Sequence, residues 1–242
     1  MKVFTHYTNL GSKGDGIRWR TILKFGNSWE VKGSVVMKNP GAANFKRPDH
    51  AAINTPEELK QLSFFDDGKL RADWYEFSSD PTMECIGRLF SEYYATKGEK
   101  LEGVIQIFNL FYLREANLTT ALNKVSQLEI ANMVDYDIQH LSFPVYLGFA
   151  DLTWHKTYEV TARQFFNAAK ELGALYLNDD FKKNTFIHPL YLMMYGKNKE
   201  KCIRAKYQFF QNTLIPVVPK ELIEATTASI VKIPQFGIRN SA

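Results

Sequence analysis

Residues 103–111 have the sequence GVIQIFNLF, in which only Gln106 and Asn109 have polar side chains. A run this apolar, without regular alternation of polar side chains, indicates a strand that is buried on both faces. Other apolar runs and helical patterns alternate with it along the chain: 34–37, 80–97, 143–150 and 158–172. Such alternation is typical of a sheet covered by helices, so we predict an α/β three-layer sandwich with a central, mostly parallel sheet.

Two features of the first third of the chain add to this prediction. β-Branched and aromatic residues at 19–25 and 28–31 flank the dipeptide Gly26-Asn27, which predicts an N-terminal β-hairpin. Residues 44–79 interrupt the alternation with prolines, an acidic turn and one short helical pattern. We therefore predict an insertion there, beside the site.

The length and composition fit one buried core. The chain has 242 residues, of which 45% are hydrophobic and 23% are charged, which excludes wholesale disorder. We predict one α/β domain over residues 1–196. A basic amphipathic pattern and a proline-punctuated stretch follow it, and they predict a C-terminal helical extension and tail over 197–242.

Several protein classes are disfavoured by the sequence. No apolar stretch approaches the roughly 20 residues of a membrane span, and polar residues follow the first four, so we expect a cytoplasmic protein without a membrane partner. Cys85 and Cys202 are far apart and have no metal-ligand spacing, so we predict neither a metal nor a cofactor. The net charge of +4 is compatible with nucleic acid but does not require it.

Polar or ring-bearing residues end three of the apolar runs. Asn39 follows 34–37, Asn109 follows 103–108, and His188 follows 185–187. Because the carboxyl ends of parallel strands converge on one crevice of an open α/β sheet, we expect these three side chains to line one pocket.

Each candidate also has a purely structural interpretation. The small residues after Asn39 suit close approach to a ligand, and they equally suit a tight turn. Asp80 is accounted for as a helix cap. The amide of Asn109 could bind the edge of a nucleobase or bond to neighbouring backbone. Arg114 could bind an anion or pair with a carboxylate such as Glu115.

Ring-bearing residues supply the remaining candidates. His188 precedes Pro189, which favours an extended backbone that aims the imidazole at the crevice, although a lone histidine is often structural. Trp154 and His155, at the end of the third apolar run, would add an aromatic platform and a second titratable group. No Ser-His-Asp order, GxGxxG motif or GxxxxGK[ST] motif is present, which excludes the best-marked enzyme classes.

Four motifs in series resemble a bacterial family named domain of unknown function 1643. Its members carry an NPSTAD-like loop, a DPT helix start, an NLFxLR segment and a terminal HPLYL. The corresponding segments here are 39–44, 80–82, 109–114 and 188–192, and the resemblance covers about residues 17–195. The chain departs from the family where Gly41-Ala42 replaces Ser-Thr, in the insertion and in the C-terminal extension.

A more distant resemblance to uracil-DNA glycosylases and their mismatch-specific relatives implies a mechanism. Their motifs are similar to segments 38–41, 109–114, 148–155 and 188–190. The resemblance implies that Asn39 positions water or the sugar and that Asn109 binds a base edge. It further implies that Phe45 or Trp154 stacks on the base and that His188 stabilises the charge developing on it.

Two positions in the motifs depart from the glycosylase pattern. Asn39 stands where one glycosylase form has an activating Asp, and the bulky pair Leu190-Tyr191 replaces small residues that contact DNA phosphate. The chemistry that the resemblance implies is hydrolysis of an N-glycosidic bond in an extruded nucleotide.

These observations lead to one predicted site and two predicted functions. Asn39 and His188 are the predicted catalytic residues, and the predicted ligand-binding residues are Pro40, Gly41, Ala42, Asn44, Phe45, Asp80, Asn109, Phe111, Arg114, Trp154, His155 and Pro189. We expect a pocket that recognises a nucleobase, nucleotide or nucleic acid and that supports metal-independent N-glycosidic hydrolysis. The alternative is a non-catalytic module that binds nucleic acid or protein.

Overall fold

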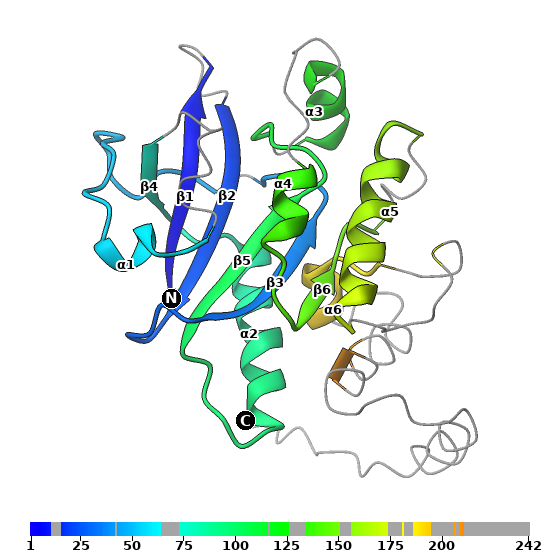
Figure 1. The fold of residues 1–242 in the computed structure, drawn as a ribbon. Helices are drawn as coiled ribbons and strands as arrows, with labels where there is room; N and C mark the ends of the chain where they lie inside the picture. Colours follow the sequence, from blue (N-terminus) through cyan, green and yellow to red (C-terminus); the bar gives the residue numbers. More distant parts are fainter. Residues whose placement is uncertain are drawn as a thin grey trace, which may run out of the picture.

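The computed structural model describes residues 1–10, 16–41, 43–63, 73–115, 117–125, 134–150, 156–173 and 186–194, and residues 181, 206, 209 and 210. Within these residues the fold is α/β, with one six-stranded sheet in the order β4-β1-β2-β5-β3-β6 (Figure 1). The strands are β1 Lys2–Asn9, β2 Gly16–Phe25, β3 Val31–Met37, β4 Asp73–Phe77, β5 Gly103–Asn109 and β6 Val145–Leu147.

The sheet is mixed, so the predicted mostly parallel sheet is wrong. Strands β5, β3 and β6 run parallel to one another, whereas β4, β1 and β2 are antiparallel to their neighbours. The central strand β5 joins the two halves, because it pairs with β2 on one edge and with β3 on the other. All seven residues of β5 are buried, as the apolar run predicts.

The predicted N-terminal hairpin is not formed. Strands β2 and β3 flank β5 and do not pair with each other. Between them the chain crosses the end of β5, where Glu30 O accepts a hydrogen bond of 2.8 Å from Val104 N. The turn at Gly26 reverses the chain, but a turn does not decide which strand becomes the neighbour. The apolar β5 takes the central place because burial on both sides stabilises it most.

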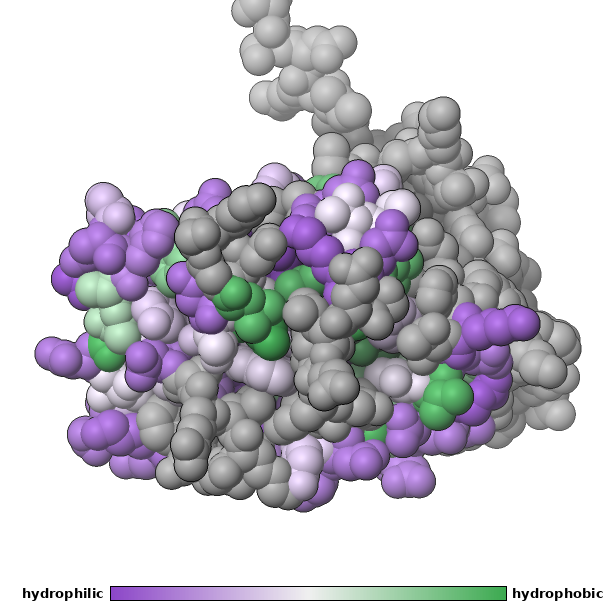
Figure 2. Space-filling model, turned by 90° about the horizontal axis from the view of Figure 1, so that it is seen from above, coloured by the Kyte–Doolittle hydropathy of each residue, from purple (hydrophilic) through white to green (hydrophobic). Residues whose placement is uncertain are grey.

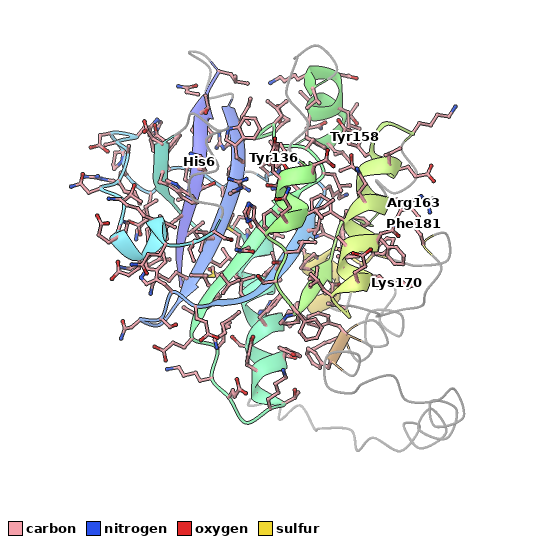
Figure 3. The ribbon with its side chains drawn as sticks, viewed as in Figure 1. His6, Tyr136, Tyr158, Arg163, Lys170 and Phe181 are labelled. Carbon is pink, nitrogen blue, oxygen red and sulfur yellow. The ribbon has the colours of Figure 1, made fainter. Side chains whose placement is uncertain are left out.

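The helices lie on both faces of the sheet. They are α1 Glu57–Lys60, α2 Pro81–Ala95, α3 Leu118–Val125, α4 Val134–Gln139, α5 Lys156–Glu171 and α6 Pro189–Met194. In Figure 1, α2 lies behind the sheet, and α4 and α5 lie in front of it. Helix α6 contacts α2, and α4 contacts α5. Arg163 of α5 also lies 4.3 Å from the ring centroid of Phe181 (Figure 3).

A β-bulge in β2 sends two neighbouring arginines to opposite faces of the sheet. Thr5 of β1 pairs with Thr21, but Tyr7 pairs with Arg18, so β2 has one extra residue at this point. Arg20 then faces α4, where its Nε lies 3.3 Å from Asp137 Oδ1, while Arg18 faces the first turn of α2. Bulges commonly re-aim a side chain in this way beside functional sites.

The described part of the predicted insertion contributes a strand to the sheet. Strand β4 pairs with β1 and forms the edge of the sheet, and an isolated bridge joins Phe45 to Phe77. Of the predicted C-terminal extension, the structure describes only Lys206, Phe209 and Phe210. Phe209 is buried, and its ring centroid lies 5.9 Å from that of Phe90 in α2. The rest of the extension lies outside the described residues.

Candidate functional site

A pocket of about 250 Å³ opens at the carboxyl ends of β3 and β5. Its lining includes Asn39, Asn109 and His188, the three side chains that the sequence predicts to share a crevice. The full lining is Arg18, Met37, Lys38, Asn39, Gly41, Asp80, Thr82, Met83, Ile86, Ile107, Asn109, Leu118 and His188. Figure 2 shows the molecule from the end toward which β3 and β5 run. Hydrophilic residues cover most of the described surface there, with small apolar patches.

Asn39 presents a hydrogen-bond acceptor to the pocket. Its Nδ2 donates to Pro40 O at 3.1 Å and to Glu115 O at 3.0 Å, which also ties the loop after β3 to the segment after β5. An amide nitrogen carries two hydrogens, so these two bonds use both. The atom of Asn39 that can serve a ligand is therefore Oδ1.

Asn109 presents a hydrogen-bond donor. It is the last residue of β5, only 1% of it is exposed, and its Nδ2 has no hydrogen-bond partner among the described residues. A buried donor left without an acceptor costs about 1–3 kcal/mol. A ligand carbonyl or ring nitrogen in the pocket would remove this cost.

Arg18 brings a buried positive charge to the pocket, and the sequence analysis did not single it out. Only 3% of it is exposed, and neither Nε nor Nη1 has a hydrogen-bond partner among the described residues. Its Cζ lies 5.9 Å from the ring centroid of Phe77. Burial lowers the pKa of Arg18 to about 10, although the Asp80 carboxylate opposes this shift, so the guanidinium stays charged at neutral pH.

Asp80 links the pocket to the start of α2. Its Oδ1 accepts a hydrogen bond of 2.9 Å from Met83 N and caps the helix, as predicted. Its Oδ2 lies close to Gly41: a Cβ added to this glycine would be 3.1 Å from Oδ2. The missing side chain of Gly41 therefore lets the carboxylate lie against the loop that follows β3.

His188 reaches the pocket from the start of α6. Its Nδ1 accepts a hydrogen bond of 3.3 Å from Leu190 N, so in the neutral imidazole the proton is on Nε2, which can donate. The next residue, Pro189, packs against Gly148 at the end of β6. A Cβ on Gly148 would lie 2.8 Å from Pro189 Cδ and 3.1 Å from Met37 Sδ. Close packing at Gly148 thus positions His188.

Replacing Gly148 with alanine is expected to lower the free energy of unfolding by about 1–3 kcal/mol, because the added methyl group overlaps the rigid ring of Pro189. Displacement of Pro189 should also move His188 and weaken ligand binding. Urea denaturation and calorimetric binding measure the two effects. Gly98→Ala is the control, because no atom lies within 4 Å of its added Cβ. At the φ of +72° an alanine is strained, so this variant should lose stability but keep ligand binding. Unchanged stability and binding in Gly148→Ala would contradict this account.

Among the described residues, the other predicted candidates do not belong to the pocket lining. Arg114 Nε donates to Ala43 O at 2.9 Å, and its Nη2 bonds to Asn44 Oδ1, so this side chain holds the loop after β3. Glu115 Oε2 lies 3.2 Å from Lys124 Nζ and forms an ion pair with it. The loop interaction gives Arg114 a structural role.

Where the structure describes them, the predicted aromatic residues belong to the core or pack against it. The Phe45 ring stacks on His50 at 4.3 Å and meets the edge of Tyr7 at 5.0 Å. Phe111 is buried, 5.1 Å from Tyr158. Pro40 and Pro189 are buried beside the pocket. The remaining predicted site residues, Ala42, Trp154 and His155, lie outside the described residues.

No protein-family model matches the chain, and comparisons with curated proteins and with solved structures find no significant match. The resemblances drawn from the motifs therefore stay predictions. None of the helices in the described ranges is both long and apolar enough to cross a membrane.

Proposed function

We propose that this pocket binds the base of a nucleotide and that the protein hydrolyses its N-glycosidic bond. One observation carries the proposal: the buried donor Asn109 Nδ2, the acceptor Asn39 Oδ1 and His188 belong to one pocket of about 250 Å³. A donor and an acceptor together match the carbonyl and N–H edge of a nucleobase. The size supports a small ligand, because drug-sized ligands occupy pockets of roughly 300–1,000 Å³.

The proposed reaction uses groups that line the pocket. Water attacks the anomeric carbon, and the bond between this carbon and the base nitrogen breaks. The base leaves as an anion with the bonding electron pair, while Nε2–H of the neutral His188 and Nδ2–H of Asn109 donate hydrogen bonds to it as negative charge develops. The Asp80 carboxylate takes a proton from the attacking water. After release this proton passes through solvent to the base anion, which leaves the base neutral and Asp80 ionised again.

Replacing Asn109 or His188 with alanine is expected to reduce base release by about 100-fold or more, because each variant removes a donor to the departing base. Chromatography of free base released from a panel of nucleosides, nucleotides and single-stranded oligonucleotides measures the effect. The control is Lys46→Gln, which removes an exposed ion pair with Glu76 outside the pocket. The pocket assignment is wrong if both alanine variants fold, release free base at the rate of the unchanged protein and bind the probes with the same affinity.

A non-catalytic role in base binding is the second candidate, and Asn39 favours it. A neutral amide cannot take a proton from water, and both hydrogens of Asn39 Nδ2 are held by backbone carbonyls. In this case the same panel would give saturable binding that depends on Asn109, without release of free base.

A further inference from the structure

We propose that the ligand of this pocket carries a terminal oxyanion, a phosphate monoester or a carboxylate, and that the Arg18 guanidinium binds it. The inference rests on the proposed function, because it names the substrate class of the same pocket. It points to a small anionic nucleotide or base rather than to a base within a nucleic acid chain.

The first argument is the geometry of Arg18. The β-bulge turns this side chain away from Arg20 and toward the first turn of α2. Its Nε and Nη1 are buried and have no hydrogen-bond partner among the described residues. A guanidinium presents a planar fork of N–H donors that matches a carboxylate or phosphate, so an oxyanion is the ligand group that fits best.

The second argument is the charge around the pocket. Among the described lining residues, Lys38 is a second basic side chain, and Asp80 supplies the only carboxylate. Asp80 accepts no hydrogen bond from Nε or Nη1 of Arg18, and its Oδ1 accepts one from Met83 N at the start of α2. Arg114 adds positive potential at Arg18 and lowers its pKa further. Among the described residues the pocket therefore keeps an excess of positive charge.

The third argument is the direction of α2. Thr82 and Met83, in the first turn of this 15-residue helix, line the pocket together with Asp80. The amino end of a helix carries partial positive charge and favours anions. The buried Arg18 guanidinium faces this turn, so the guanidinium and the amino end of α2 together form the oxyanion site.

Burial of Arg18 decides between a terminal and an internal anion. Only 3% of the residue is exposed, so an anion that contacts it must enter the pocket. An internal phosphodiester continues as chain on both sides, and a pocket of about 250 Å³ has little room for two exits. A monoester or a carboxylate is attached on one side only.

Calorimetric titration of the full chain with matched probes tests the inference. The probes are the common nucleoside 5′-monophosphates against their nucleosides, orotate against uracil, and inorganic phosphate. We expect the anionic member of at least one pair to bind roughly 10- to 100-fold tighter, which is the range for a hydrogen-bonded charge. The nucleotide pairs and the orotate pair distinguish phosphate from carboxylate.

Variants of Arg18 locate the effect. In Arg18→Met the preference for the anionic member should disappear, and in Arg18→Lys a weaker preference should remain, because the charge is kept without the fork. Arg47→Gln is the control, since this exposed arginine pairs with Asp49 outside the pocket. Should Arg18→Met fail to fold, the lysine variant and the matched probes still show whether Arg18 binds the anion.

The outcomes separate this inference from the proposed function. Equal binding of both members of every pair, dependent on Asn109, overturns the oxyanion site and leaves base recognition standing. Binding of inorganic phosphate alone, dependent on Arg18, supports the oxyanion site and contradicts base recognition. An anion preference that survives in Arg18→Met overturns the role of Arg18, and no binding of any probe contradicts both proposals.

Discussion

Replacing Asp137 with alanine is expected to lower the free energy of unfolding by about 3–5 kcal/mol. Asp137 and Arg20 are each 1% exposed, and Asp137 Oδ1 lies 3.3 Å from Arg20 Nε. The Tyr112 hydroxyl donates to the other oxygen of the same carboxylate. Removal of the carboxylate leaves a buried guanidinium without its ion-pair partner, and the burial of an uncompensated charge is costly.

Urea denaturation of three variants distinguishes the ion pair from simple loss of packing. Asp137→Ala should lose the most stability, and Tyr112→Phe should lose about 1 kcal/mol, because it removes one hydrogen bond only. The double variant Arg20→Met with Asp137→Leu should recover most of the loss, since it removes both charges. A loss below about 1 kcal/mol in Asp137→Ala would contradict the importance of the pair. Ligand binding should persist, because this pair faces α4 and the pocket faces α2.

Features with a local cause were predicted correctly from the sequence. The apolar run at 103–109 forms the central strand β5, because such a run is stable only where both faces are covered. Asp80-Pro81 begins α2, because a cap and a proline suit the unpaired N–H groups of the first turn. The two asparagines also line one pocket as predicted, but the cause is not local, because it is the parallel pairing of β3 with β5 that brings them together.

Features that depend on long-range pairing were not predictable in this way. The hairpin prediction failed because a turn shows only that the chain reverses direction. It does not show whether another strand, here β5, lies between the two strands that the turn connects. Arg18 was missed because in a regular strand it would share a face with Arg20. The bulge that separates them is visible only in the register of β2 against β1. A charged residue inside an apolar strand was the one signal in the sequence that could have identified Arg18.

Replacing Arg18 with methionine is expected to raise the free energy of unfolding of the ligand-free protein by about 2 kcal/mol. Burial lowers the pKa of Arg18 well below its ordinary value, to about 10, so the charged form is less favourable in the folded protein than in the unfolded chain. Methionine removes this cost and keeps an apolar contact with Phe77. The loss of the cation–π contact, worth about 1 kcal/mol, is included in the estimate.

The sign of the pH dependence provides a second test of the same variant. The folded protein releases the Arg18 proton near pH 10, whereas the unfolded chain keeps it to a higher pH. The cost of burial is therefore present in full below pH 10 and falls as the pH rises through 10, so the advantage of Arg18→Met should shrink there. Thermal unfolding of both proteins at pH 7 and above pH 10 measures this difference.

The sign of the stability change shows whether Arg18 serves the fold or a ligand. Replacing a residue kept for folding should lower stability, whereas replacing a residue held at a cost for binding should raise stability and weaken binding of the anionic ligand. Addition of an anionic ligand should then stabilise the unchanged protein more than Arg18→Met, because the variant lacks the contact with the anion. A destabilised Arg18→Met that keeps the preference for the anionic ligand would assign Arg18 to the core. Greater stability together with loss of that preference would assign the charge of Arg18 to the pocket.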